Sequence, residues 1–216
     1  MIVADEQTQG MGRLGRKWES AKGGLYFSII LSAKHFLPDI QISTIICALG
    51  VQKTIGKNVD CLIKWPNDII SKDGKKLCGI LTKAIFTDGN AEYINVGIGI
   101  NANNSSFPDD LPYASSIKNT ISNEVDENRL MSDVFECVEE CISKEKSLLL
   151  EEYSKSCITI GSNVRAIYSQ TGESFTGLCT GINDDGSLNI RKENSEIVTV
   201  NSGEISVRGI YGESYV

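Results

Sequence analysis

The spacing of apolar residues predicts two parts of the chain. The first part combines helices and strands, and the second part contains short strands only. Apolar residues from Ile42 to Leu49 recur at helical spacing, so residues 39–56 are predicted to form an amphipathic helix that ends at Gly56. The polar turn at residues 72–75 lies between two apolar runs and predicts a β-hairpin. The strand-like runs of this part are residues 2–4, 25–31, 61–65, 69–70, 77–81 and 93–100.

The C-terminal half has a different pattern. Residues 101–127 are polar and loop-like, and an apolar face from Leu130 to Leu148 predicts one long helix over about residues 129–153. After Gly161, short β runs alternate with turns, which is typical of a small barrel. We therefore predict an α+β fold, with a mixed β-sheet and helices over residues 1–160 and a small β-barrel domain over 161–216. The five expected strands are residues 163–168, 175–182, 188–191, 197–200 and 205–208.

The densest candidate chemistry lies in residues 7–18. This segment combines three glycines (Gly10, Gly12 and Gly15) with three cations (Arg13, Arg16 and Lys17) and ends at Trp18. Glycine lets backbone N–H groups come close to an anion, and guanidinium groups match the geometry of carboxylate and phosphate. The segment predicts a site that holds a small acid beside a nucleotide phosphate. A solvated glycine turn with surface cations is the alternative.

The same glycine spacing also matches the dinucleotide-binding fingerprint. That fingerprint requires a helix after its third glycine and an acidic residue about 20 residues further on. Only residues 16–22 separate Gly15 from the Gly23-Gly24 break, which is too short for a crossover helix, and no carboxylate ends the run 25–31. A Rossmann site is therefore not expected. A P-loop is excluded because no Gly-Lys-Ser/Thr follows.

Composition narrows the class of protein further. The net charge of −7 argues against a nucleic-acid partner, and no apolar run is long enough to cross a membrane. Seven cysteines without a Cys-x-x-Cys pair indicate reduced thiols in the cytoplasm. Cys137 and Cys141 are expected to pack on a helix. Because His35 is the only histidine, we predict no metal site and no His-based catalytic pair, and we assign the chemistry to Lys, Arg and carboxylates.

A second polar cluster completes the pattern. Lys64-Trp-Pro-Asn-Asp68 follows a predicted strand, Lys75-Lys-Leu-Cys-Gly79 follows the hairpin turn, and Gly97-Ile-Gly-Ile-Asn101 ends the last strand of the main domain. With the glycine segment and Gly203-Glu-Ile-Ser206, these motifs resemble the biotin–protein ligase family over about residues 2–210. The resemblance implies a biotin/lipoate ligase-like catalytic domain followed by an SH3-like barrel.

The resemblance implies a two-step reaction. Biotin and ATP, which arrives with Mg²⁺, would form biotinyl-5′-AMP, and a lysine of a biotin carboxyl carrier domain would then take the biotinyl group. Neither step needs an enzyme nucleophile. The enzyme must instead align two anions, stabilise a charged transition state and exclude water. The partner implied is a carrier domain of acetyl-CoA carboxylase or a related carboxylase, and a homodimer is possible.

The family roles transfer to individual positions of this chain. Lys76 and Arg13 would be catalytic, Lys76 lying between the biotin carboxyl and the α-phosphate. Without the motif, each would be interpreted as an ordinary exposed cation. The biotin-binding residues implied are Gln7, Met11, Gly12, Arg13 and Lys76. The adenylate-binding residues implied are Gly10, Gly15, Arg16, Trp18, Asn67, Asp68, Gly79 and Asn101. Trp18 could equally belong to the core, and Asn67 and Asp68 could form a structural corner.

Three departures from the family pattern qualify the hypothesis. Met11 stands where the family usually has arginine, which removes one cation, and Thr82-Lys83 stands where the family often has an acid. The family also carries a Ser/Thr-Asn segment upstream of the first matching strand, so the chain is expected to lack part of the pocket wall. Three alternatives follow: a binding-only remnant, a lipoate- or octanoyl-transferring relative, and an interaction module built on residues 161–216.

Overall fold

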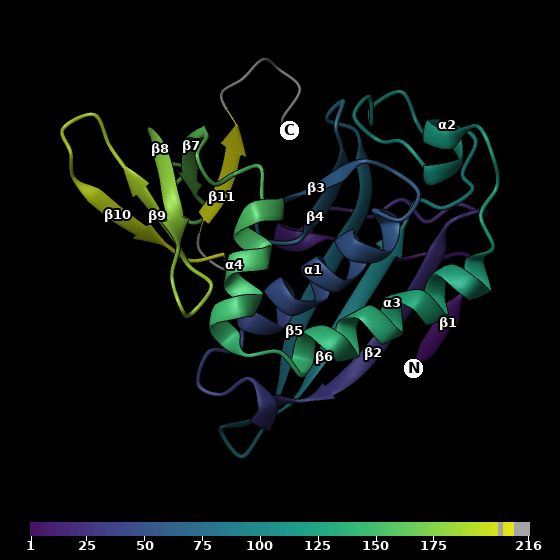
Figure 1. Cartoon of the computed structure of the whole chain (residues 1–216), viewed down its shortest axis with the longest axis horizontal. Coiled ribbons are helices and arrows are strands. Elements are labelled where there is room, and N and C mark those ends of the chain that lie inside the picture. Colours follow the sequence, from purple (N-terminus) through teal and green to yellow (C-terminus); the bar gives the residue numbers. More distant parts are fainter. Residues whose placement is uncertain (203–204, 210–216) are drawn as a thin grey trace.

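The computed structural model describes residues 1–202 and 205–209, which form two sheets and a layer of helices. Helices α1 (Ile42–Ile55), α3 (Glu127–Ile142) and α4 (Lys146–Ser156) lie together on one face of the larger sheet (Figure 1). The smaller sheet lies beside α4 and carries the C-terminal strands. The predicted α+β class is confirmed by this arrangement.

The larger sheet is antiparallel throughout, in the order β1-β2-β6-β5-β4-β3. Its strands are β1 (Ile2–Ala4), β2 (Leu25–Ser32), β3 (Cys61–Lys64), β4 (Asp68–Ser71), β5 (Lys76–Thr87) and β6 (Asn90–Ile100). The predicted strands and hairpin are confirmed. An antiparallel order joined by hairpins is not the parallel βαβ architecture of a Rossmann fold, so the exclusion of that fold is also confirmed.

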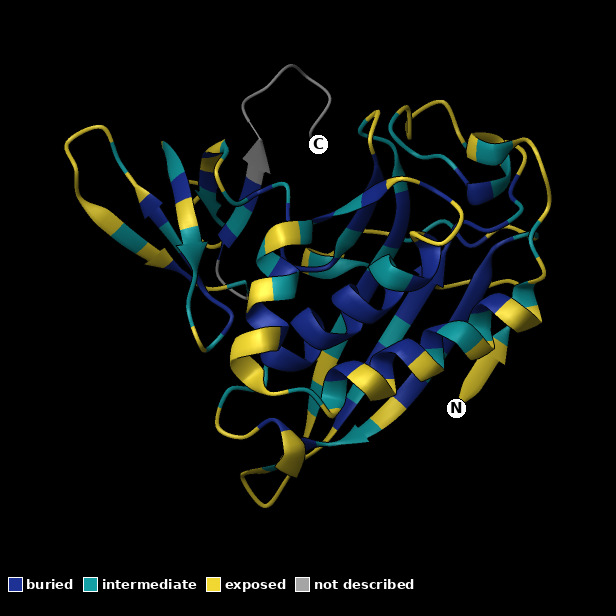
Figure 2. Ribbon diagram, viewed as in Figure 1, coloured by how far each residue is buried: buried dark blue, intermediate teal, exposed yellow. Residues whose placement is uncertain are grey.

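The main core lies between the sheet and α1. Side chains alternate along a strand, so every second residue of β6, from Ile94 to Ile100, points to the helices and is buried. Helix α1 is buried along almost its whole length, shown in dark blue in Figure 2. All seven cysteines are buried and unpaired, including Cys137 and Cys141, so their expected packing role is confirmed. Burial raises the pKa of the Cys47 thiol to about 12, which keeps it protonated.

The predicted single helix over residues 129–153 is wrong. The chain forms two helices, α3 and α4, because the backbone leaves the helical conformation at Glu145, which precedes α4. The break changes which residues face the core. Leu149 and Leu150 are buried, whereas Leu148, predicted on the apolar face, is 52% exposed. A continuous periodicity in the sequence conceals this break because each helix keeps its own apolar face.

Residues 101–127 form a long connection that the sequence indicates only in part. Most of it is loop, as predicted, but it also contains the short helix α2 (Ile117–Ile121). Ser116 caps this helix through its side chain, and Ile117 is fully buried. Two short 3-10 turns, η1 (Arg13–Gly15) and η2 (Ala33–His35), were not predicted either. Turns of this length leave no hydrophobic period in a sequence.

The smaller sheet follows the strand pattern of the C-terminal segment, in the order β10-β9-β8-β7-β11. Its strands are β7 (Asn163–Tyr168), β8 (Ser174–Ile182), β9 (Leu188–Arg191), β10 (Ile197–Val200) and β11 (Ile205–Gly209). The buried indole Nε1 of Trp65 donates a hydrogen bond to the carbonyl of Gly186 at 3.1 Å and so joins this sheet to the main domain. Gly203 and Glu204 of the C-terminal signature lie outside the described residues.

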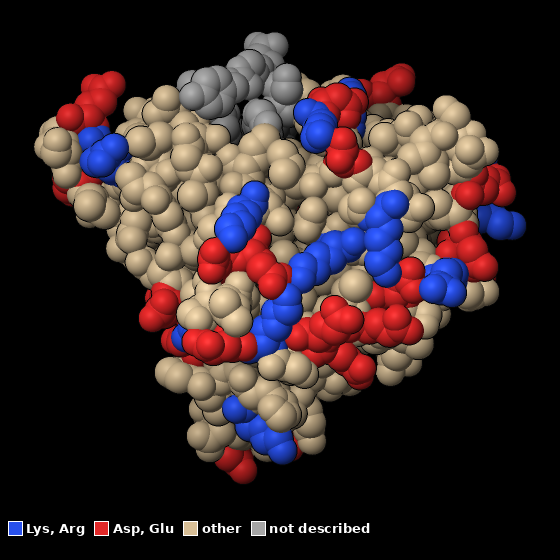
Figure 3. Space-filling view, viewed as in Figure 1, with Lys and Arg blue, Asp and Glu red and all other residues tan. Residues whose placement is uncertain are grey.

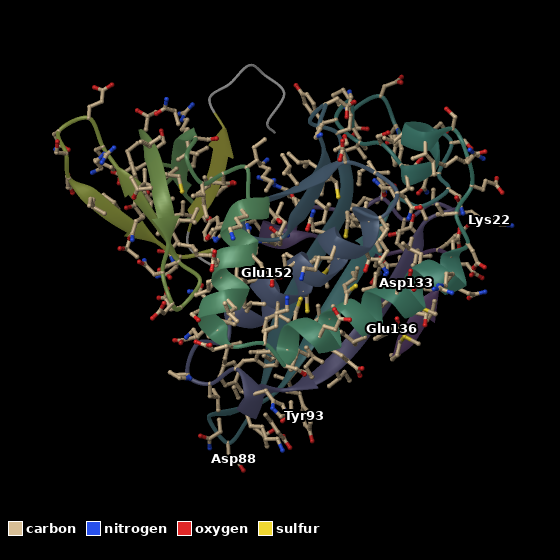
Figure 4. All side chains as sticks on the ribbon, in the orientation of Figure 1. Lys22, Asp88, Tyr93, Asp133, Glu136 and Glu152 are labelled. Carbon is tan, nitrogen blue, oxygen red and sulfur yellow. The ribbon has the colours of Figure 1, made fainter. Side chains whose placement is uncertain are left out.

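The outer surface of the helices carries charges of both signs close together (Figure 3). Ion pairs connect the three helices there: Lys53 pairs with Glu152, and Lys57 pairs with Asp133 at 3.3 Å. Figure 4 shows Asp133 and Glu152 on α3 and α4. These pairs leave the helical face without a broad basic patch. Within the described residues, no helix is long and apolar enough to span a membrane.

The crossing of α1 and α3 yields the first testable prediction. Gly50→Ala would place a Cβ 2.7 Å from Cγ2 of Val138 and 3.0 Å from its backbone nitrogen. Alanine normally stabilises a helix interior by about 1 kcal/mol over glycine. Overpacking costs about 1–3 kcal/mol, so we expect the clash to dominate and the free energy of unfolding to fall.

Urea denaturation of four proteins would measure this effect: the wild type, Gly50→Ala, Val138→Ala and the double variant. Because Val138→Ala removes the closest contact, the double variant should be more stable than the sum of the two single effects predicts. Strict additivity, or a stabilising Gly50→Ala, would contradict the close crossing.

Candidate functional site

A cavity of about 760 Å³ lies on the face of the larger sheet that the helices leave uncovered. The glycine segment, residues 7–19, forms one wall, and the corner at residues 64–68 and the loop at residues 107–114 form others. Ser206 and Val207 of β11 bring the C-terminal module to the edge of the cavity. Antiparallel strands β2, β5 and β6 provide the floor. The sequence motifs thus meet in one place, although they are far apart along the chain.

Trp18 lies directly on the floor of this cavity. Gly79 on β5 and Gly99 on β6 are opposite each other in the sheet. A Cβ at Gly99 would lie 2.6 Å from Nε1 of Trp18, and one at Gly79 would lie 2.8 Å from its ring. Only bare glycine backbone therefore admits the indole here. A Cβ at Gly97, by contrast, would meet only ordinary contacts, at 3.7 Å or more.

The glycine segment is a narrow loop that its own backbone holds together. The Trp18 N–H donates to the Gly10 carbonyl at 2.9 Å, and the Gly12 N–H donates to the Arg16 carbonyl at 2.7 Å. At its tip, Leu14 and Gly15 have φ values of 57° and 73°, in the left-handed region that favours glycine. Gly15 makes this turn and does not line the cavity. The loop therefore presents both Arg13 and Trp18 to the cavity.

Arg13 connects three separate parts of the chain. Its Nη1 donates to Oδ1 of Asn67 at 3.1 Å, and its Nη2 donates to the carbonyl of Ser202 in the C-terminal module. Burial lowers the pKa of the Arg13 guanidinium, and the nearby Asp68 carboxylate opposes that shift. An arginine nevertheless stays charged in proteins. Its positive charge is thus fixed at the wall of the cavity by two acceptors.

Lys76, like Arg13, is held in place by several contacts. Its ammonium lies 2.8 Å from Oδ1 of Asp68 and 5.2 Å from the centre of the Trp18 ring. Its backbone N–H donates to the carbonyl of Tyr113, and its carbonyl accepts from Nδ2 of Asn101 at 3.2 Å. The lysine is therefore held from the hairpin, from the strand end and from the 107–114 loop. Asp68 supplies its counter-ion.

The structure brings nearly all of the predicted site residues together. Every one except Gly15 lines the cavity: Gln7, Gly10, Met11, Gly12, Arg13, Arg16, Trp18, Asn67, Asp68, Lys76, Gly79 and Asn101. Two of them, Asn67 and Asn101, use their side-chain amides for hydrogen bonds within the protein. Both amide hydrogens of Asn101 go to the carbonyls of Lys76 and Ser115, and Asn67 bonds to Arg13 and to the carbonyl of Ile80. These amides position other groups.

Several lining residues escaped the sequence analysis. Phe107, Leu111 and Tyr113 come from a segment interpreted only as polar loop. Ser28, Lys83 and Asn95 come from the uncovered face of the sheet. The alternation of buried and exposed residues along β2, β5 and β6 was the available signal for Ser28, Lys83 and Asn95, because residues on the face opposite the buried set face the cavity. No residue pattern indicated that the 107–114 loop folds back.

The arrangement suits binding and charge stabilisation. Arg13, Arg16 and Lys76 surround one end of the cavity, and the residues described there include no cysteine or histidine. No group of three or more His, Cys, Asp or Glu side chains in residues 1–202 and 205–209 is arranged to hold a metal. What the geometry offers is a cationic end, an aromatic face and a floor of bare backbone.

Comparison with known proteins first shows which protein-family models the chain matches. Residues 1–101 match the biotin/lipoate A/B protein ligase family, and residues 159–208 match the biotin protein ligase C-terminal domain. Biotin protein ligase from Aquifex aeolicus, solved in complex with biotin and ATP, has 29% sequence identity and a TM-score of 0.82, covering 96% of this chain and 88% of that chain.

Two curated relatives narrow this class. The bifunctional ligase/repressor BirA of Bacillus subtilis is 32% identical, over 96% of this chain and 66% of its own length. The biotin–[acetyl-CoA-carboxylase] ligase of Mycobacterium tuberculosis is 26% identical, over 95% of this chain and 77% of its own. The chain thus spans slightly less than two thirds of the first relative. The chain belongs to the biotin protein ligase family.

The contact between Trp18 and the glycine pair yields a matched test. Gly99→Ala should displace the indole from the floor because the new Cβ would lie 2.6 Å from Nε1, whereas Gly97→Ala should leave it in place. The measurement is the tryptophan emission spectrum in a Trp65→Phe background, where Trp18 is the only tryptophan. We expect the tryptophan emission to shift to longer wavelength in Gly99→Ala and to stay unchanged in Gly97→Ala. Equal spectra for the two variants would contradict the contact.

Proposed function

We propose that the chain is an ATP-dependent biotin–protein ligase, with its catalytic domain in residues 1–160 and its C-terminal module in 161–216. The observation that carries the proposal is the convergence of Arg13, Lys76 and Trp18 on one glycine-lined floor. That convergence provides what the activation of a carboxylate by a nucleotide requires. Family membership and the ligands bound by the Aquifex aeolicus protein support it.

In the first step, a carboxylate oxygen of biotin attacks the α-phosphorus of ATP, and pyrophosphate leaves with the nucleotide's Mg²⁺. The two reactants are anions that repel each other. Lys76, whose ammonium faces the cavity beside the Trp18 ring, would lie between them and neutralise the charge that builds up on the α-phosphate. Arg13 would add a second cation from the loop. The loop and Trp18 would also hold the two groups in line.

In the second step, the neutral ε-amine of a carrier-domain lysine attacks the carbonyl carbon of biotinyl-5′-AMP. The amide bond forms, AMP leaves, and the amine proton passes to solvent. The adenylate is prone to hydrolysis, so water must be kept out until the amine arrives. We propose that the glycine loop, held by Arg13 between Asn67 and Ser202, closes over it.

The remaining predicted residues divide into two groups. Gln7 and the backbone of Met11 and Gly12 are proposed to line biotin. Gly10, Arg16, Trp18 and Gly79 are proposed to lie along the adenylate, with Gly15 shaping the loop. Asn67, Asp68 and Asn101 are proposed to act through Arg13 and Lys76, because their side chains already bond or pair inside the protein.

The cellular setting follows from the same chemistry. The seven unpaired cysteines fit a cytoplasmic protein. The proposed partner is a biotin carboxyl carrier domain of a carboxylase, and association into a homodimer is compatible with the proposal.

The decisive measurement is the intact mass of a biotin carboxyl carrier domain after incubation with the chain, biotin and MgATP. We expect the mass of one biotinyl group to be added. Lys76→Ala should slow adenylation about tenfold to a hundredfold, because a charge-assisted hydrogen bond contributes about 1.5–3 kcal/mol. Lys72→Ala is the matched control, since Lys72 lies on the same hairpin, exposed and paired with Asp60 outside the cavity.

A folded protein that binds biotin but adds no mass would contradict the ligase proposal and favour the binding-only alternative. Transfer of a lipoyl or octanoyl group in preference to biotin would favour the acyl-transferring relative. Equal rates for Lys76→Ala and Lys72→Ala would contradict the role of Lys76 while leaving the activity itself intact.

A further inference from the structure

The loop at residues 107–114 forms one wall of the cavity, and much of its hydrogen bonding is internal. Its backbone makes two turns of its own, with N–H donors at Leu111 and Ala114. At its C-terminal end, the Tyr113 carbonyl accepts from the backbone N–H of Lys76 at 2.6 Å. Internal turns shape a loop without fixing it against the protein. The position of this wall therefore depends on bonds from outside the loop.

The side chain of Lys75 supplies such a bond. Its ammonium donates to the carbonyl of Pro112 at 2.7 Å and lies 5.9 Å from the centre of the Tyr113 ring. Within the described part of the chain, this is the only hydrogen bond that joins residues 106–112 to a residue outside the loop. A charged donor makes a stronger hydrogen bond than a neutral one, and an ammonium is attracted to the face of an aromatic ring. Lys75 thus holds the part of the wall that the backbone bonds do not reach.

The backbone of Lys75 is itself fixed in the hairpin. Its N–H donates to Oγ of the buried Ser71 at 3.2 Å, and its carbonyl accepts from the Ser71 N–H at 2.8 Å. Adjacent side chains of an extended chain point in opposite directions. Lys76 accordingly lines the cavity, whereas Lys75 does not line it and bonds to the loop instead. The two neighbouring lysines therefore have different tasks: one faces the cavity, and the other holds a wall.

We propose that Lys75 is a positioning residue that fixes the 107–114 loop as a preformed wall of the cavity. Ordering a loop costs conformational entropy, and a ligand that meets a preformed wall does not have to offset that cost. The consequence for the reaction rests on the proposed ligase function. The fixed loop retains biotinyl-5′-AMP between the two steps and keeps water away from it. Lys75 touches no reactant and acts through Pro112 and Tyr113.

Hydrogen exchange of the protein without ligands tests the positioning directly, because exchange reports local opening. It would compare the wild type, Lys75→Met and Lys75→Arg at the amides of Leu111 and Ala114, whose hydrogen bonds lie within the loop. Methionine keeps the apolar stem of the side chain and removes its charge and donors, whereas arginine keeps both. Lys72→Met is the matched control, since Lys72 lies on the same hairpin and pairs with Asp60 at 2.6 Å, outside the cavity.

We expect Lys75→Met to speed exchange at Leu111 and Ala114 about tenfold, as the loss of one charge-assisted hydrogen bond predicts. Lys75→Arg should restore most of the protection, and Lys72→Met should exchange as the wild type does. The acceleration should be larger in the loop than along β6. That difference separates positioning of the loop from a general loss of stability.

Release of the intermediate tests the consequence for the reaction. Each variant would be incubated with biotin and MgATP but no carrier domain, and biotinyl-5′-AMP would be measured both in the filtrate and on the protein. We expect Lys75→Met to release it about tenfold faster than the wild type. The single-turnover rate of adenylation should fall much less than in Lys76→Ala, because the Lys76 ammonium keeps its pairing with Asp68.

Three results would overturn the inference and leave the ligase proposal standing. Equal loop exchange in Lys75→Met and wild type would show that the backbone bonds alone fix the wall. Equal acceleration in the loop and along β6 would make Lys75 a general stabilising residue. Faster loop exchange with unchanged release of biotinyl-5′-AMP would show that the loop does not retain the intermediate. A wild type that forms no adenylate, although its loop exchange depends on Lys75, would overturn the ligase proposal alone.

Discussion

The contact between the Trp18 indole and the bare backbone of Gly79 and Gly99 determines where the site can form. A loop rich in glycine has little to hold it against a sheet, because each glycine loses much backbone freedom on ordering. The indole supplies a large apolar surface, and the glycine pair provides a flat place for it. Once Trp18 is seated, the short hydrogen-bonded loop positions Arg13, and the ring lies beneath the ammonium of Lys76.

The site exists because the sheet is covered on one side only. Helices α1, α3 and α4 cover the face that carries the buried residues of β6, and the other face remains available to a ligand. Alternation along each strand then assigns every second residue to the core and its neighbours to the cavity floor. The direction in which a side chain points from its strand therefore decides whether it packs in the core or lines the cavity. Glycines can occupy the binding face because that face carries no core packing.

Acidic and amide groups around the cavity hold cations in place without cancelling their effect on a ligand. Asp68 sits beside Lys76 from the strand side, and Asn67 with the Ser202 carbonyl fixes Arg13 from behind. Because Ser202 belongs to the C-terminal module and Trp65 donates to Gly186 of the same module, the small sheet supports the loop and the corner together. The module is therefore joined to the site by specific hydrogen bonds as well as by the chain.

The sequence by itself determined the strands, the first helix and the α+β class, because periodicity is a local property. Through the resemblance of its motifs to the biotin–protein ligase family, it also named residues that nearly all line one cavity. It predicted one helix where α3 and α4 form two, because each keeps its own apolar face and only packing reveals the break. Tertiary structure alone decided that Asn101 holds the backbone of Lys76 and that residues 107–114 line the cavity. The partners of a side chain depend on which distant segments the fold brings together, and that information is not local.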